Sequence, residues 1–272
     1  MPEFTSHVQG TPSWAELSTT DDQGALAFYS ALFGWMDEAN EMGPGRYYHM
    51  QKLNGLEVAA MYQQGDEEKQ QGVPPHWKVY FTVDDIQTST EQAKESGATV
   101  IFGPIDVFDA GHAAILQDPQ GAVFALWQAK DHIGARIKGE TGAVMWNELL
   151  TNAPEDATKF YTSLLGMGST KMPGPMDYTM LNVGGTDLAG VMAITDDMGP
   201  VPPHWMVYFG VDNVDAAADK AASLEGSVIV PQADIPGIGR FAGLKDPPRG
   251  DVFHIQPGKL GTLNAQDKKL EL

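Results

Sequence analysis

The chain has 272 residues, of which 42% are hydrophobic and none is cysteine, and its formal net charge is −19. The lack of cysteine excludes disulfides, zinc–thiolate sites and cysteine nucleophiles, and the acidity argues against nucleic acid and anionic membranes as partners, because both are bound through Lys and Arg. No apolar run approaches the about 20 residues that span a bilayer, and no signal peptide precedes the first strand, so we expect a cytoplasmic protein of two domains.

The first 72 residues predict the order strand, helix, strand, strand, with room for a further strand. The expected segments are a loose polar arm at 1–11, a strand at 13–17, a helix at 20–34, strands at 46–53 and 57–62, and a charged loop at 65–72. Gly34 suits a left-handed helix C-cap. Asn54-Gly55 between the two strands is the strongest short signal for a β-hairpin.

A second unit opens at Pro74-Pro75-His76-Trp77, and the same four residues recur 128 positions later, at His204 compared with His76. A repeat of this length indicates a duplicated domain rather than a solenoid. The alternation that follows predicts a strand with Trp77, Val79 and Phe81 on one face and His76, Lys78 and Tyr80 on the other. One face must be core, and the polar and aromatic face is expected to decide what the protein does.

The rest of the chain repeats the pattern of the first half. A helix after Asp84-Asp85 and a hairpin around Asp118-Pro119 complete a second unit, and the pair Trp14 and Glu16 reappears as Trp146 and Glu148. We therefore predict an α+β fold of four βαβββ units in two homologous domains, at 12–130 and 142–258, joined by a polar linker.

Three motifs resemble a known family. They are Phe28-Tyr29 with Leu32-Phe33-Gly34-Trp35, Val83-Asp84-Asp85, and Gly239-Arg240-Phe241 with Asp246-Pro247. They are similar to the glyoxalase, bleomycin-resistance and extradiol-dioxygenase group (the vicinal oxygen chelate superfamily), in particular its tandem two-domain glyoxalase-like members. The resemblance implies that each pair of units curls a mixed sheet around a cleft, but this fold carries several activities, so it does not decide the function.

The resemblance also implies three strand positions that hold a metal in the enzymes of the family. These positions carry Trp14, Lys78 and Ala125 in the first domain, and Trp146, Met206 and His254 in the second. His254 alone is a plausible ligand, and Lys78 adds a competing positive charge. We therefore expect no metal and no other cofactor.

A register shifted by two residues keeps the same face of each strand and leaves a partial site open. That register offers Glu16 and Glu148 from the first strands, and His76 and His204 from the later ones. Each carboxyl is either a general base with a raised pKa or the partner of a lysine or tyrosine. Each histidine either contacts a ligand or binds a neighbouring loop.

Aromatic residues complete the candidate binding set. Trp14, Trp127 and Trp146 either stack on a planar ligand or pack across the cleft, and Tyr80 and Tyr208 suit a pocket wall or the edge of a core. Methionines such as Met192 and Met198 line or approach the second cleft, where Met206 replaces Lys78.

Two functions follow, and whether the protein is an enzyme is left open. The first is a small-molecule-binding protein with metal-free, aromatic-lined clefts. The second is a divalent-metal-dependent lyase or dioxygenase of the glyoxalase type, with Glu148 as base or ligand. We expect the second cleft to dominate, because Glu148 has no lysine to satisfy it. A single chain supplies both domains, which favours a monomer or a weak homodimer.

Overall fold

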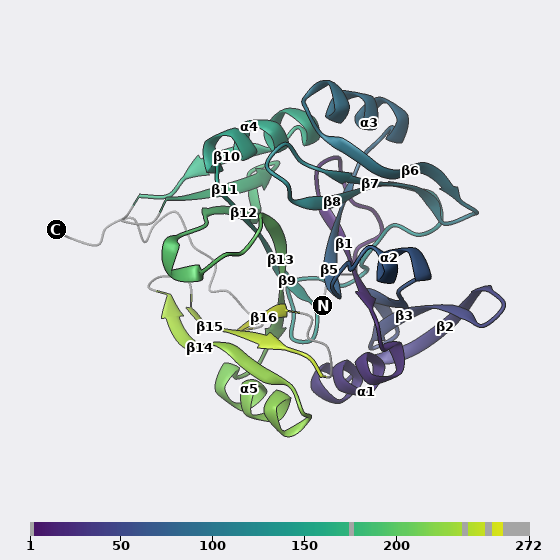
Figure 1. The fold of residues 1–272 in the computed structure, drawn as a ribbon, viewed down its shortest axis with the longest axis vertical. Helices are drawn as coiled ribbons and strands as arrows, with labels where there is room; N and C mark the ends of the chain where they lie inside the picture. The colour runs from purple at the N-terminus through teal and green to yellow at the C-terminus, as the bar shows by residue number, and fades with distance from the viewer. Residues whose placement is uncertain (1–2, 174–176, 236–238, 248–251, 258–272) are drawn as a thin grey trace.

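The computed structural model describes residues 3–173, 177–235, 239–247 and 252–257, and these form two sheets of eight strands each (Figure 1). The first half comprises β1 (Pro12–Thr19), α1 (Asp22–Phe33), β2 (Met36–Gly43), β3 (Arg46–Leu53), β4 (Leu56–Gln63), α2 (Asp66–Gln70), β5 (His76–Thr82), α3 (Ile86–Glu95), β6 (Thr99–Val107), β7 (Gly111–Gln117) and β8 (Val123–Ala129). The order of strands in the sheet is β2-β3-β4-β1-β5-β8-β7-β6.

The second half repeats this arrangement element by element. It comprises β9 (Val144–Thr151), α4 (Pro154–Leu165), β10 (Gly168–Lys171), β11 (Tyr178–Val183), β12 (Thr186–Ala193), the 3₁₀ turn η1 (Asp196–Met198), β13 (His204–Val211), α5 (Val214–Ser223), β14 (Ser227–Ile235), β15 (Gly239–Lys245) and β16 (Val252–Pro257). The strand order β10-β11-β12-β9-β13-β16-β15-β14 matches that of the first sheet. The predicted α+β fold of four βαβββ units is confirmed, and each sheet curls into a half-barrel.

Local sequence signals account for the main turns and caps. Asp21 accepts a hydrogen bond from the backbone of Gly24 at the start of α1, and Gly34 ends this helix in the left-handed conformation, with φ of 76°. Asn54 and Gly55 both have positive φ, 53° and 81°, as a two-residue hairpin turn requires.

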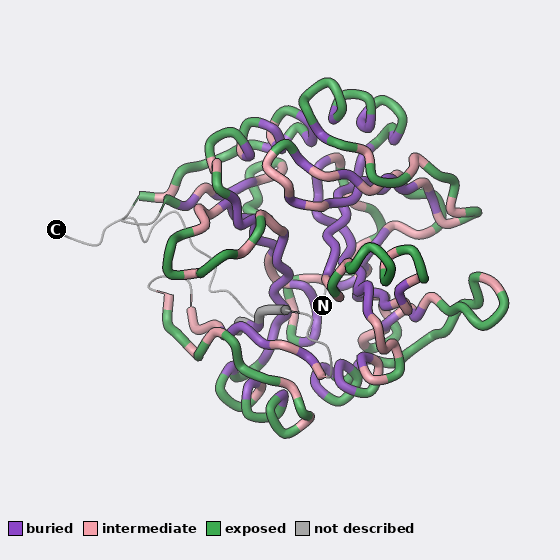
Figure 2. The backbone as a smooth tube through the Cα atoms, viewed as in Figure 1, coloured by how far each residue is buried: buried purple, intermediate pink, exposed green. Residues whose placement is uncertain are grey.

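One hydrophobic core joins the two halves. The Trp-x-Val-x-Phe faces of β5 and β13 lie back to back, with the rings of Phe81 and Trp205 5.1 Å apart and those of Trp77 and Phe209 5.0 Å apart. Helices also pair across the halves, α1 with α5 and α3 with α4 (Figure 1). Figure 2 shows the buried strands of this core at the centre and exposed helix surfaces at the rim.

Two expectations about irregular segments are wrong. The arm before β1 is not loose, since Phe4 N donates to Arg136 O at 2.9 Å and Gly10 N to Thr82 O at 2.8 Å. It is held by backbone hydrogen bonds, which a reading of polarity cannot detect. The charged segment 65–72 is not a plain loop either, because it contains the short helix α2, whose first turn is acidic and suits a helix N-terminus.

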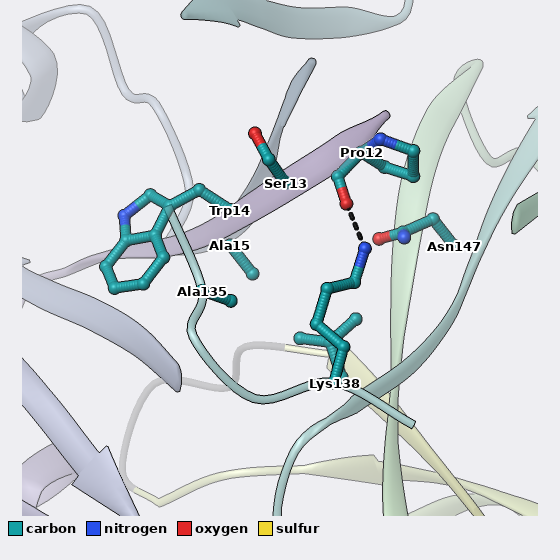
Figure 3. A pocket seen from close by; sticks show the side chains of 8 residues that line it. Pro12, Ser13, Trp14, Ala15, Ala135, Lys138 and Asn147 are labelled. Atoms are coloured by element: carbon teal, nitrogen blue, oxygen red, sulfur yellow. Dashed lines mark hydrogen bonds between the residues drawn. The ribbon is translucent and has the colours of Figure 1, made fainter. Parts of the chain in front are cut away.

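A lysine of the linker lies at the seam between the first strands of the two sheets. Lys138 Nζ donates to Pro12 O and lies beside Asn147 of β9 (Figure 3). Burial lowers the pKa of Lys138 to about 8, because the charged form is poorly solvated there.

We predict that Lys138 makes stability rise with pH. Between pH 8 and 10.5 the unfolded chain binds a proton that the folded protein has released, so raising the pH through this window favours folding. Urea unfolding at pH 7.5 and pH 10 should show the wild type gaining stability relative to Lys138→Met. A difference between the two proteins that stays constant with pH would contradict this.

Candidate functional site

The inner face of each sheet, defined as the face opposite to the shared core, carries a Trp–Tyr–Glu–Tyr chain of hydrogen bonds. In the first sheet, Trp14 Nε1 donates to Tyr48 OH at 3.0 Å, and Tyr48 OH donates to Glu16 Oε2 at 2.9 Å. Tyr80 OH donates to the other oxygen, Glu16 Oε1, at 2.9 Å. The indole of Trp14 orients the Tyr48 hydroxyl, and the two tyrosine hydroxyls together hold both oxygens of the Glu16 carboxyl in place.

The second inner face repeats this chain with the corresponding residues. Trp146 Nε1 donates to Tyr178 OH at 3.0 Å, Tyr178 OH to Glu148 Oε2 at 2.8 Å, and Tyr208 OH to Glu148 Oε1 at 3.0 Å. A Cβ on Gly190 would lie 1.9 Å from the Tyr178 hydroxyl, so only glycine leaves room for this tyrosine. The two faces thus place one carboxyl in the same geometry.

The surroundings of the two carboxyls differ in charge. Lys78 lies opposite Glu16 across β1 and β5, and its Nζ is 3.4 Å from Glu16 Oε1. Burial alone would lower the pKa of Lys78, but Glu16 and its neighbours outweigh that effect and raise it. Lys78 is therefore charged, as expected for a partner of Glu16.

Glu148 has a methionine where Glu16 has this lysine. Met206 occupies the position opposite Glu148 on β13, and burial raises the pKa of Glu148, while hydrogen bonds from Tyr178 and Tyr208 oppose the rise. Among the described residues, no ion pair involves Glu148. The Glu148 carboxyl therefore keeps its proton more readily than an ordinary glutamate does.

The side chains around Glu16 are mostly polar, whereas those around Glu148 are mostly apolar. The first face adds Ser18, Tyr62, Glu68 and Lys78; at the matching places the second has Leu150, Met192, Met198 and Met206, which pack together with Trp146 and Tyr208. The second wall is apolar and largely thioether, a surface that adapts to irregular ligands.

The structure places the remaining candidates in less prominent roles. His76 Nδ1 and His204 Nδ1 bind the carbonyl oxygens of Pro74 and Pro202, at 2.9 and 2.7 Å, which is the neighbouring-loop interpretation. Trp127 is buried and donates to His132 O at 2.8 Å. Trp14 is also buried, whereas Trp146 is half-exposed and so is the indole best placed to stack on a ligand.

The three strand positions that the family resemblance implies do not lie opposite one another across neighbouring strands. Trp14 and Ala125 both lie opposite Tyr80, whereas Lys78 lies opposite Glu16. In the second sheet, Trp146 and His254 lie opposite Tyr208, and Met206 opposite Glu148. Trp14, Lys78 and Ala125 therefore do not lie side by side on neighbouring strands, as three ligands of one metal ion would. The His254 side chain lies outside the described part of the structure.

The donor set does not suit a divalent cation in the first half. Within the described residues, no group of three or more His, Asp or Glu side chains is placed to hold a metal ion. Glu16 is paired with an ammonium group, which would repel a cation. In the second half, Glu148 is the one described oxygen ligand at its level, and both of its oxygens already accept tyrosine hydroxyls.

Comparisons with known proteins agree with this architecture. Residues 14–127 match the model of the glyoxalase-like domain, and residues 141–250 match that of the glyoxalase/bleomycin resistance protein/dioxygenase superfamily. The chain belongs to this superfamily. The family resemblance of the sequence is therefore confirmed, and the tandem arrangement of two such domains holds.

Relatives of similar length are known. A protein of Mycobacterium tuberculosis named "Putative glyoxylase CFP32" is 42% identical over 94% of this chain and 97% of its own. The anthracycline biosynthesis protein DnrV of Streptomyces peucetius is 35% identical over 90% of this chain and 92% of its own.

Solved structures share the fold at low identity. A Mn(II)-bound glyoxalase from Novosphingobium aromaticivorans has a TM-score of 0.65 and 14% identity, over 92% of this chain and 83% of its own. The 2,3-dioxygenase LapB from Pseudomonas sp. KL28 has a TM-score of 0.62 and 16% identity, over 92% of both chains.

The helices in the described part of the chain are too short or too polar to span a membrane.

Sequence reasoning missed Tyr48, Tyr178 and the Ser18–Tyr62–Glu68 group. The repeat held a signal for the tyrosines, since Tyr48 and Tyr178 stand 130 residues apart (178 minus 48), close to the offset of the other repeated motifs. Glu68 had no such signal, because it comes from a segment that was expected to be a loop.

We predict unequal losses of stability when each carboxyl is replaced by its amide. Glu16→Gln leaves the buried Lys78 without its charge partner and should cost about 3 kcal/mol of stability. Glu148→Gln keeps a polar group of the same shape and should cost less than about 1 kcal/mol at pH 7. Urea unfolding of both variants checks this, and equal losses would refute the assigned electrostatics.

The pH dependence of Glu148→Gln gives a second check. Above pH 4.5 the unfolded chain loses a proton that the folded Glu148, with its raised pKa, retains. The wild type must therefore lose stability as pH rises through this window. The free energy of unfolding of Glu148→Gln should therefore increase relative to that of the wild type between pH 4.5 and 7. A difference between the two proteins that does not change with pH would contradict the direction of the pKa shift.

Proposed function

We propose that the protein binds a small, planar, mainly apolar molecule without a metal, and that the inner face of the second sheet is the principal site. The observation that carries this proposal is the exchange of a polar wall for an apolar one around the same carboxyl. Met206 lies opposite Glu148 and belongs to an apolar cluster with Leu150, Met192 and Met198, whereas the first face neutralises Glu16 with Lys78. A face of this kind offers contact area and one polar group, which is the usual composition of a small-molecule site.

Each group on the second face has a separate role in binding. The half-exposed indole of Trp146 stacks on a flat ring, and Met192 and Met198 adjust to its outline. Because burial raises the pKa of Glu148, the carboxyl keeps its proton more readily than usual and can donate to a carbonyl or hydroxyl oxygen of the ligand. Tyr178 and Tyr208 hold the carboxyl still while it does so.

The name of DnrV connects one relative with anthracycline biosynthesis, and this supports a small organic compound as the ligand. A cytoplasmic monomer or weak dimer accords with the proposal, because each sheet brings together the two units that a single-domain protein would assemble by pairing.

The rival proposal is a divalent-metal-dependent lyase or dioxygenase with Glu148 as base or ligand. The register of β16, which sets His254 opposite Tyr208, is the observation in its favour. Against it stands the donor set at the level of Glu148, where Met206 and two hydroxyl donors leave little for a cation to bind. Zinc sites need three or four good ligands.

Metal content separates the two proposals. Protein purified without chelators and dialysed against a mixture of Zn²⁺, Mn²⁺, Ni²⁺ and Fe²⁺ should retain well below one equivalent of metal per chain, measured by elemental analysis. One tightly bound equivalent that is lost in Glu148→Gln would favour the enzyme and end the metal-free account.

We predict that exchanging the residues opposite the carboxyls changes affinity for a planar probe. Met206→Lys should pair with Glu148 as Lys78 does with Glu16, ionise the carboxyl and weaken binding of 1-naphthol or a hydroxyanthraquinone about tenfold, since each 1.4 kcal/mol is a factor of ten. Trp146→Ala should weaken it similarly, by loss of stacking.

The matched control is Trp14→Ala on the first face, and all variants are compared by calorimetry after circular dichroism confirms their fold. If Trp14→Ala lowers affinity more than Trp146→Ala does, the principal site lies on the first sheet and the assignment is wrong.

A further inference from the structure

The connection from β4 to β5 places one side chain against the polar end of the first inner face. Its helix α2 has five residues, of which Asp66, Glu67, Lys69 and Gln70 are exposed and Glu68 is half-buried. Figure 2 shows this helix as a mainly exposed segment beside the buried strands β1 and β5. Glu68 is the residue of the helix whose side chain reaches the sheet.

Glu68 accepts three hydrogen bonds in this position. Oε1 receives them from Ser18 Oγ at 3.1 Å and Tyr62 OH at 3.0 Å, and Oε2 from the backbone of Gly65 at 3.0 Å. Burial raises the pKa of Tyr62 to about 12, so its hydroxyl keeps the proton that it donates. The carboxylate is bound as an external anion would be, by converging donors from two strands.

A cation lies directly behind these donors. Lys78 Nζ is 3.4 Å from Tyr62 OH, so the chain Lys78–Tyr62–Glu68 runs from ammonium to carboxylate through one hydroxyl. Glu16 already neutralises Lys78 at 3.4 Å, and the fold does not need a second carboxylate there to satisfy the lysine.

The corresponding connection in the second half also places one side chain against the inner face of its sheet. The turn η1 between β12 and β13 brings Met198 against the apolar wall of Met192 and Met206. In each half the delivered side chain matches the wall that it covers, a carboxylate on hydroxyls and a thioether on thioethers. We interpret Glu68 and Met198 as occupying positions that a ligand group of the same chemical kind could take.

The helix α2 has few contacts that hold it in place. A solvent-open recess of about 390 Å³ lies beside it, lined by Thr20, Gln64, Lys69, Gly72 and Val73. Among the described residues, Thr20 Oγ1 and Gln64 Oε1 are buried without a hydrogen-bond partner. A short helix with mostly exposed residues belongs to the less stable part of a fold.

We propose that the first inner face holds an anion subsite, which Glu68 occupies within the chain and which a small organic carboxylate takes when α2 lifts. Ser18 and Tyr62 would donate hydrogen bonds to the incoming carboxylate, and the charge of Lys78 would attract it through Tyr62. This site is on the other sheet from the principal site and takes a charged ligand, so it is independent of the proposed function. An internal group competes at an effective concentration of about millimolar, and Glu68 therefore keeps the subsite closed to weak ligands.

The experiment compares Glu68→Ala with Glu67→Ala, its exposed neighbour on the same helix. Benzoate is the probe and benzyl alcohol its uncharged control, both titrated by NMR. Glu68→Ala should bind benzoate at least about tenfold more tightly than the wild type, because the internal competitor is gone. Glu67→Ala should behave as the wild type, and benzyl alcohol should gain nothing from either change.

Two further measurements make the test specific. Adding Tyr62→Phe to Glu68→Ala removes a donor of the subsite and should abolish the gain. Amide hydrogen exchange at 65–73 should accelerate at least about tenfold in Glu68→Ala, which reports the opening of α2 without any ligand. Glu68→Ser, whose side chain is too short to reach Ser18 and Tyr62, provides the same comparison if the alanine variant fails to fold.

Unchanged benzoate affinity in Glu68→Ala overturns the proposal, as does a gain that survives Tyr62→Phe. Unchanged hydrogen exchange shows that Glu68 does not hold the helix, and this too refutes it. None of these outcomes touches 1-naphthol binding on the second sheet, so the failure of one proposal is separable from the failure of the other.

Discussion

The back-to-back packing of β5 against β13 is the constraint on which the rest of the structure depends. Trp77, Phe81, Trp205 and Phe209 form aromatic contacts across the two halves, and such pairs add about 0.5–1.5 kcal/mol each beyond the burial of their area. Because side chains alternate along a strand, the packing of these four rings leaves the opposite sides of the same strands for the inner faces.

This arrangement gives the protein two copies of one hydrogen-bonded carboxyl in different electrical surroundings. Glu16 faces an ammonium group, and Glu148 faces a thioether. The change of one residue opposite each carboxyl converts a self-neutralising pair into a group whose pKa burial raises. Duplication supplies the geometry twice, and divergence of the walls gives the two carboxyls polar surroundings in one half and apolar surroundings in the other.

The fold could be read from the sequence because its signals are local and repeated. The alternation after His76 and after His204, the glycine at position 34 and the Asn54-Gly55 turn each determine a conformation within a few residues. The motif spacing then shows that the same unit occurs again.

The sequence predicted the candidate site only in part. The face shared by Lys78 and Tyr80 follows from alternation, and the same alternation in the second half places Met206 where the first half has Lys78. The level at which strands face one another does not, because register depends on turns and bulges; a bulge in β1 shifts the pairing between Pro12 and Trp14. Contacts from distant segments, such as Tyr48 on Glu16 or Glu68 on Ser18, were beyond local patterns.

We propose that the buried carboxyl of Glu148 in its apolar wall binds an organic ligand without a metal. A crystal structure of protein exposed to both 1-naphthol and Mn²⁺ or Zn²⁺, with anomalous diffraction data, tests this binding. We expect ring-shaped density against Trp146 and Met206, with its hydroxyl at Glu148, and no anomalous peak on the second inner face. An anomalous peak coordinated by Glu148, with no ring beside it, would rule out metal-free binding at this carboxyl.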